Sequence, residues 1–114
     1  MDKLESTLRD ADDQTWLIDL GHAIIEKKRT EGVDALSPRE RLIRCLWVAD
    51  YSMRNAGDLA TARDLESQYR DDGLAAATLL GLRVAADMFA LSEGELERRY
   101  FDLFDAVCGE LRGH

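Results

Sequence analysis

The chain has 114 residues, of which 46% are hydrophobic and 33% charged, and its formal net charge is −8 at pH 7. This length suits a single domain with its own core, and the composition is unlike that of a disordered protein. The negative balance argues against a domain that binds nucleic acid or an anionic membrane directly, because such domains present a basic surface.

The first residues are polar and contain no apolar stretch of the kind found in signal peptides, so we expect a cytoplasmic protein. Leu4 and Leu8 stand four residues apart, which predicts a short helical turn in a loosely attached segment, residues 1–13. The first long helix is predicted over residues 14–30, with an N-cap supplied by Asp12 and Asp13. Its apolar stripe consists of Trp16, Leu17, Leu20, Ala23 and Ile24.

The clearest helix start in the sequence is at Ser37, which is followed by Pro38 and by Glu40. A serine at the N-cap with a glutamate three residues later is a capping box, and proline suits the first helical position. This helix is predicted to run to residue 55 or 56. Gly57 is well placed to end it in the left-handed conformation.

Three more helices are predicted in the second half of the chain, over residues 59–69, 74–91 and 93–111, with a turn at 70–73. The stretch 74–91 carries only two charges, so a helix there is apolar on nearly every side and must be enclosed. A second capping box, from Ser92 to Glu95, starts the last helix. The sequence therefore predicts one all-α domain, residues 1–114, a compact bundle of about five helices around the central stretch 74–91.

The sequence contains no motif for metal, cofactor or catalytic chemistry. His22 and His114 are its only histidines, Cys45 and Cys108 belong to no CxxC pair, and no glycine-rich phosphate loop is present. We therefore expect a non-enzymatic protein with no metal, no cofactor and no disulfide.

Asp50 is the one carboxylate predicted on a buried helix face, between Trp47 and Met53. A buried carboxylate must be satisfied, so hydrogen bonds to an arginine, a tyrosine or a helix end are the favoured interpretation. The alternative is a small helical enzyme or ligand-binding domain in which Asp50 and Asn55 line a polar pocket with Trp47 and Tyr51.

Acidic residues concentrate on the outer helices and at two turns, and the candidates for a partner-binding surface are Asp10, Asp12, Asp13, Asp71, Asp72, Glu95, Asp102 and Asp105. Spaced carboxylates can imitate a row of phosphates and enter a basic groove. They can also serve only to keep a small protein soluble, and the sequence alone favours that simpler explanation. The arginines of the helix that starts at Pro38 are expected to pair with neighbouring acids; they are Arg39, Arg41, Arg44 and Arg54.

A capped helix start of the form Leu-Ser/Thr-x-x-Glu-Arg is present at Leu36, Ser37, Glu40 and Arg41, and residues 55–57, Asn-Ala-Gly, stand where an Asn-Gly-Gly turn would follow. In these features residues 36–105 resemble a family of small bacterial all-helical domains, mostly of unknown function, whose characterised member is a DNA-mimic protein. The sequence departs from the family pattern by an alanine for the first glycine of the turn and by Asp58 for the aromatic residue after it. The resemblance implies an acidic protein that binds a DNA-binding protein, such as a transcription factor, and keeps it from DNA.

The leading hypothesis is a non-enzymatic acidic module that binds a basic protein partner, with DNA mimicry as its most concrete form. An immunity-type protein that neutralises a nuclease toxin would use the same chemistry, and a ligand-binding or enzyme domain built on Asp50 is the alternative of a different class. A homodimer also stays open. No direct contact with nucleic acid or membrane is expected.

Overall fold

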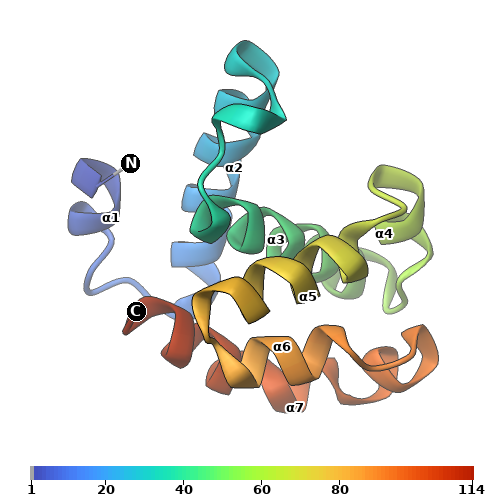
Figure 1. Ribbon diagram of the computed structural model, residues 1–114. Helices are drawn as coiled ribbons and strands as arrows, with labels where there is room; N and C mark the ends of the chain where they lie inside the picture. The colour runs from blue at the N-terminus through green and yellow to red at the C-terminus, as the bar shows by residue number, and fades with distance from the viewer. Residues whose placement is uncertain (1) are drawn as a thin grey trace.

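The computed structural model describes residues 2–114, which fold into a helical globule with a Cα radius of gyration of 12.9 Å and, in this part of the chain, no strand (Figure 1). The elements are α1 (Asp2–Thr7), α2 (Asp13–Glu31), the 3₁₀ turn η1 (Val33–Ala35), α3 (Pro38–Ala56), α4 (Ala60–Leu65), α5 (Tyr69–Leu80), α6 (Arg83–Phe89) and α7 (Glu93–Arg112). The all-α prediction is confirmed, although the described residues form seven α-helices instead of about five. None of these helices combines the length and the hydrophobicity needed to cross a membrane.

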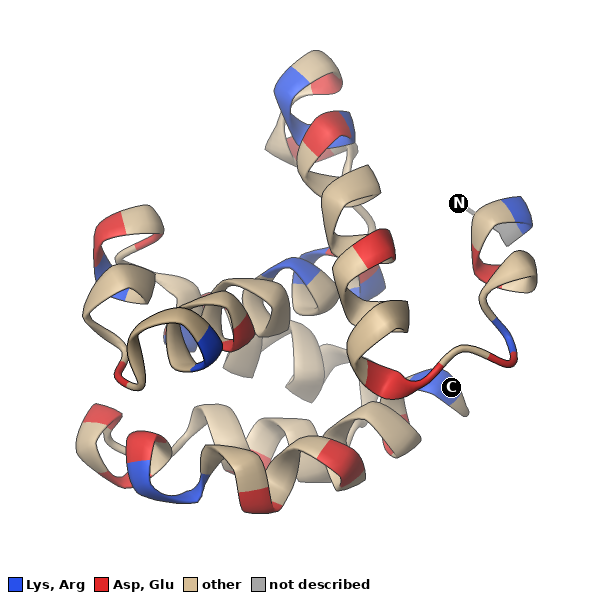
Figure 2. Cartoon of the chain, turned by 180° about the vertical axis from the view of Figure 1, so that it is seen from behind, with Lys and Arg blue, Asp and Glu red and all other residues tan. Residues whose placement is uncertain are grey.

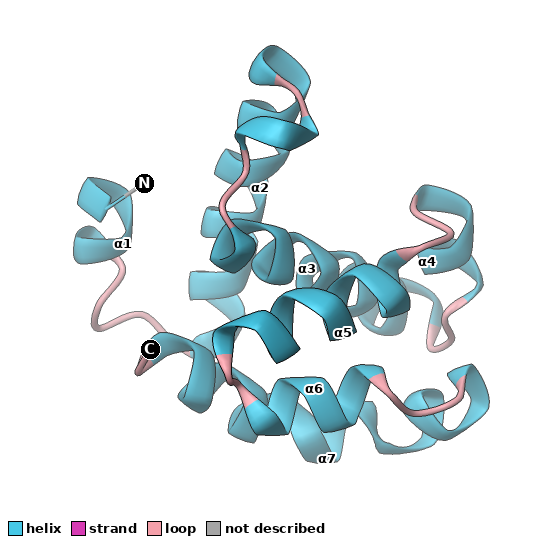
Figure 3. Cartoon of the chain, in the orientation of Figure 1, coloured by secondary structure: helices cyan, strands magenta, loops and turns pink. Residues whose placement is uncertain are grey.

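The pair α3 and α5 lies in the middle of the molecule, and the other helices are arranged around it (Figure 1). α6 and α7 pack against each other on one side of α5, while α2 stands steeply on α3 and α4 lies beside the other end of α3. The connections between the helices are short (Figure 3). Large side chains that are fully buried fill the interior; they include Trp16, Tyr69, Phe89 and Tyr100.

Helix ends that depend on local capping lie where the sequence predicts them. The Asp12 side chain accepts a hydrogen bond of 2.7 Å from the Thr15 amide at the start of α2. Ser37 and Glu40 form the complete capping box of α3, with reciprocal bonds of 3.1 and 2.9 Å. Gly57 ends α3 at a φ of 76°, the left-handed conformation that glycine adopts without steric cost.

The second predicted capping box is only half formed. Ser92 accepts a hydrogen bond of 3.2 Å from the Glu95 amide and so caps α7. The Glu95 carboxylate does not return to the Ser92 amide, because it pairs with Arg98 one turn further along.

The prediction of one central helix over residues 74–91 is wrong. The stretch is divided between α5 and α6, with Gly81 at a φ of 72° between them. The Leu82 amide donates to the Ala77 carbonyl at 2.9 Å, a bond across the glycine that closes a helix in the Schellman manner. α5 also starts earlier, at Tyr69, and takes in the predicted turn 70–73. One side of α5 faces solvent, since the Leu79 side chain is 73% exposed.

The start of α6 is stabilised by a carboxylate from another helix. Glu110, on α7, accepts hydrogen bonds of 2.9 Å from the Val84 amide and 3.0 Å from the Ala85 amide. The first amides of a helix have no partner within the helix, and a negative charge there also suits the helix dipole. No side chain at the N-cap residue Leu82 caps α6. The Glu110 carboxylate, far away in the sequence, takes this role.

Replacing Glu110 by alanine is expected to lower the free energy of unfolding by about 1 kcal/mol, the typical loss when an N-cap side chain is removed. Glu110→Gln keeps one acceptor oxygen and should cost about half as much. Urea unfolding followed by circular dichroism measures both changes. Equal stability of the alanine variant and the unchanged chain would mean that the carboxylate does not hold α6.

The helix predicted over residues 59–69 is shorter than expected. α4 covers only Ala60–Leu65, and the chain leaves the helical conformation at Glu66 before Tyr69 starts α5. The Leu65 side chain, at the end of α4, is 52% exposed.

Side-chain contacts connect the N-terminal segment to the body of the protein. Both guanidinium ends of Arg39 bond to the Glu5 carboxylate at 2.6 Å. Arg112, near the end of α7, donates to the carbonyls of Leu8 and Arg9 at 3.3 and 2.9 Å. The Leu8 side chain is itself buried in the core.

Two glycines allow neighbouring helices to approach closely. A Cβ atom added to Gly21 of α2 would lie 2.3 Å from Cδ1 of Trp47 on α3. A Cβ atom on Gly73 of α5 would lie 2.8 Å from Cγ of Phe89 on α6. Each aromatic ring therefore rests directly on the backbone of the helix beside it.

Candidate protein-binding surface

The buried carboxylate of Asp50 is bonded from two helices. Within α3, Arg54 Nε donates to its two oxygens at 2.9 and 3.0 Å. From α7, the Tyr100 hydroxyl donates to Oδ1 at 2.7 Å. Of the expected partners, an arginine, a tyrosine or a helix end, the first two bond to Asp50, and the tyrosine joins α3 to α7.

Two aromatic side chains of α7 contact the Arg54 guanidinium that bonds to Asp50. The Arg54 guanidinium lies 5.2 Å from the ring centre of Phe101 and 4.9 Å from that of Phe104, within the range of a cation–π contact. Burial raises the pKa of the Tyr100 hydroxyl well above its usual value, and the Asp50 carboxylate adds to this effect. The Tyr100 hydroxyl therefore stays protonated at neutral pH and acts as a hydrogen-bond donor to Asp50.

A surface pocket of about 260 Å³ lies next to this network between α2 and α3. Its lining residues are Gln14, Ile18, His22, Trp47, Asp50, Tyr51, Arg54 and Asn55. The Trp47 and Tyr51 rings stack at 5.2 Å, and His22 meets the Trp47 ring edge-on at 5.7 Å. The structure thus brings together the residues that the sequence analysis assigns to a polar pocket, but the Asp50 carboxylate in it already has partners.

Neither cysteine is placed as a nucleophile. Cys45 and Cys108 are both buried free thiols. Burial raises the pKa of each thiol to about 12, so both are protonated at neutral pH. Among the described residues no group of three or more histidine, cysteine or acidic side chains is close enough together to hold a metal ion.

Most of the basic side chains are neutralised within the protein. Arg39, Arg44 and Arg54 pair with Glu5, Glu66 and Asp50, as expected for the arginines of α3. Other ion pairs join Lys27 to Glu40, Arg29 to Glu26, Arg63 to Glu93, Arg98 to Glu95 and Arg112 to Asp13. These pairs use more than half of the 15 lysines and arginines of the chain.

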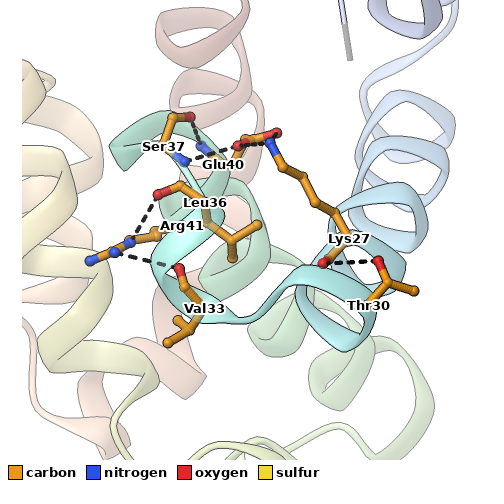
Figure 4. A network of polar contacts seen from close by, with 7 residues as sticks. All are labelled: Lys27, Thr30, Val33, Leu36, Ser37, Glu40 and Arg41. Atoms are coloured by element: carbon orange, nitrogen blue, oxygen red, sulfur yellow. Dashed lines mark hydrogen bonds and ion pairs between the residues drawn. The ribbon is translucent and has the colours of Figure 1, made fainter.

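Arg41 differs from the other arginines of α3 because carbonyl groups hold it (Figure 4). Its guanidinium donates to the Leu36 carbonyl at 3.2 Å and to the Val33 carbonyl at 3.4 Å. Its predicted pairing with an acid is wrong. In the same view, Lys27 reaches across to the capping-box carboxylate of Glu40 at 3.0 Å.

Three of the predicted partner-binding acids are already used within the protein. Asp12 caps α2, and this bond lowers the pKa of its carboxyl group. Asp13 accepts a hydrogen bond of 2.9 Å from Arg112, and Glu95 pairs with Arg98. These carboxylates are less available to a partner than the sequence pattern indicates.

The other predicted acids are exposed and have no hydrogen-bond or ion-pair partner within residues 2–114; they are Asp10, Asp71, Asp72, Asp102 and Asp105. Asp71 and Asp72 lie in the first turn of α5 rather than in a turn between helices. Asp102 and Asp105 stand three residues apart on the outer side of α7. Asp19 on α2, which is not among the predicted partner-binding acids, is also exposed and has no hydrogen-bond or ion-pair partner among the described side chains.

Acidic segments run along α2 and α7 on the side shown in Figure 2, and the end of α3 lies between these two helices. Two exposed aromatic residues belong to this region: Tyr51 of α3 is 43% exposed and Phe101 of α7 is 50% exposed. Arg54 connects them, since it lines the pocket beside Tyr51 and lies over the Phe101 ring. We use the name acidic face for the set of exposed residues Asp19, Tyr51, Phe101, Asp102 and Asp105. Helical periodicity marks Tyr51 and Phe101 as lying beside the core stripes, but it does not reveal that both lie near Arg54.

No protein-family model matches the chain, and none of the curated proteins or solved structures compared with it matches either. The resemblance to the family with a DNA-mimic member therefore remains an expectation from the sequence.

Proposed function

We propose that this chain is a non-enzymatic protein-binding module whose acidic face engages a basic surface of a partner protein. The proposal rests on a difference in pairing. Most cations are bound to acids within the fold, whereas exposed carboxylates such as Asp102 and Asp105 have no partner among the side chains that the structure describes. The net charge of −8 therefore resides largely in groups that are free to meet a partner.

The most concrete form of this proposal is a DNA-mimic inhibitor of a DNA-binding protein, as the family resemblance implies. Exposed carboxylates would steer the two proteins together and replace phosphates in the partner's groove. Tyr51 and Phe101, both exposed, would then supply the aromatic contact area that often contributes most to affinity. Such an interface weakens as salt screens the charges.

Two other functions are the alternatives to this proposal. An immunity-type protein would use the same acidic chemistry against a nuclease toxin, and a toxin gene next to this one would favour it. A ligand-binding or enzymatic role for Asp50 and Asn55 receives less support, because Arg54 and Tyr100 already bond to the Asp50 carboxylate. The Asn55 amide likewise donates to the Tyr51 carbonyl at 2.8 Å.

Affinity capture from a lysate of the source organism, at low and high salt and with duplex DNA as competitor, tests the proposal. We expect a basic DNA-binding protein that salt releases and DNA displaces. The double variant Asp102→Asn with Asp105→Asn should bind that protein about tenfold more weakly at low salt. The double variant Asp34→Asn with Asp64→Asn removes the same charge from η1 and α4 and should change the affinity by no more than about twofold.

Two results would contradict the proposal. If no basic partner is captured, the acidic face has no such function. If both double variants weaken binding equally, overall charge rather than the acidic face determines the interaction. A partner that resists salt and DNA would point instead to a packed interface of the immunity type.

A further inference from the structure

A second surface, on another side of α3, has the opposite chemistry. Two hollows of about 330 and 440 Å³ adjoin there, and the Arg44 side chain lines both. The first lies between α3, α5 and η1 and is lined by residues that include Val33, Arg41, Ala75 and Leu79. The second lies between α2, α3 and α4 and is lined by Ile25, Lys28, Arg29, Arg44, Trp47, Val48 and Leu65. We call the two together the α3 groove.

Exposed apolar side chains border the α3 groove. Leu79 is 73% exposed, Leu65 52% and Val33 47%. The remaining large apolar residues with comparable exposure, Tyr51 and Phe101, belong to the acidic face. Exposed apolar residues gathered around a hollow, rather than scattered singly, are typical of a surface that another molecule covers.

The charged residues of the groove are mainly cationic. Lys28, Arg29, Arg41 and Arg44 line it, and Asp72 is the one acidic residue in the lining. Arg41 is held by two carbonyl groups, and no carboxylate among the described side chains pairs with it. Lys28 has no ion-pair partner within residues 2–114, whereas Arg29 and Arg44 share their charge with Glu26 and Glu66. The chain as a whole has a net charge of −8, so the groove differs from the rest of the surface in its concentration of cations. This charge favours an acidic ligand in the groove.

We propose that the α3 groove binds an acidic amphipathic helix of a partner protein. A helix laid in the groove would place apolar side chains, spaced i, i+3, i+4 and i+7, against Val33, Leu79 and Leu65. Carboxylates flanking its apolar stripe would meet Arg41 on one side and Lys28 on the other. In Figure 1, α2 and α4 project from the same side of the α3–α5 pair, so they would flank such a helix. This site shares none of the residues that define the acidic face.

The test uses the full-length, ¹⁵N-labelled chain and a designed peptide with leucines at the four helical positions and glutamates elsewhere, at an ionic strength of about 0.15 M. We expect amide shift changes at residues of the α3 groove, including Arg41, Trp47 and Leu79. A peptide with the same leucines but lysines in place of the glutamates should bind the groove about tenfold more weakly, and so should a proline-containing version that cannot form a helix.

Substitutions at exposed positions locate the binding, and circular dichroism of each variant checks that the fold is kept, because Arg41 also bonds to the Leu36 and Val33 carbonyls. Leu79→Asp and Arg41→Glu should each weaken binding of the acidic peptide about tenfold. Phe101→Ala, a change on the acidic face, should leave it within about twofold and serves as the matched control. If the lysine peptide binds the groove as tightly, if the shifts fall outside the groove, or if Leu79→Asp has no effect, the proposal is wrong. It is also wrong if sedimentation shows a dimer that Leu79→Asp dissociates, because a second copy then covers the groove.

Discussion

Replacing Asp50 by alanine is expected to lower the free energy of unfolding by about 3 kcal/mol, since the change leaves a buried donor and a cation without their acceptor. The Tyr100 hydroxyl, in a fully buried side chain, loses its partner and cannot reach water. Arg54 suffers less because its side chain is 29% exposed and can turn toward solvent. Urea or thermal unfolding of the purified variant measures the loss.

A double-mutant cycle isolates the bond between the two helices. Tyr100→Phe removes only the hydroxyl and should cost about 1 kcal/mol. In a chain that already carries Asp50→Ala, Tyr100→Phe should lower the free energy of unfolding little further. The two changes should therefore show a coupling energy of about 1 kcal/mol. If Asp50→Ala is neutral, the carboxylate does not stabilise the fold, and a role for Asp50 in the neighbouring pocket gains weight.

Replacing Gly21 by alanine is expected to lower the free energy of unfolding by about 2 kcal/mol, the cost of inserting a methyl group into a tightly packed contact. The added Cβ would lie 2.3 Å from Cδ1 and 3.0 Å from Cβ of Trp47. Rotation of the indole alone does not relieve the second contact, because the Trp47 Cβ atom is fixed to the backbone of α3. The two helices must therefore move apart, and the higher helix propensity of alanine, about 1 kcal/mol, offsets only part of the cost.

Gly109→Ala is the matched control, since this glycine also lies within a helix but has nothing within 4 Å of its added Cβ atom. It should raise the stability by about 1 kcal/mol through helix propensity alone. A Gly21→Ala variant as stable as Gly109→Ala would mean that α2 and α3 are not as close as described.

Much of the secondary structure could be predicted because short-range chemistry determines it. Ser37 with Glu40 starts α3 and Gly57 ends it, all through contacts within one or two turns. The break at Gly81 was missed because apolar residues continue on both sides of it. Gly81 alone does not require a break, and the carboxylate that caps α6 belongs to Glu110, which lies 26 residues beyond Val84.

The candidate site was less predictable than the fold, because its pairings join distant parts of the chain. The sequence indicates that Asp50 is buried, and Arg54 is within reach one helical turn away. The Tyr100 hydroxyl, 50 residues away, cannot be assigned to Asp50 by periodicity. Asp13 counts as a free acid in the sequence, but Arg112 bonds to it across 99 residues. Long-range pairing therefore decides which carboxylates remain free.

Trp47 lines two separate hollows of the surface. Its indole lines the pocket beside Tyr51 and also the half of the α3 groove next to Leu65. The other tryptophan, Trp16, is 1% exposed in the core. The Trp47 side chain therefore lines both the pocket and the α3 groove. A molecule that binds in one of them and shifts the indole changes the shape of the other. Two ligands bound on opposite sides of one side chain are linked in free energy, so each alters the affinity of the other by the same factor.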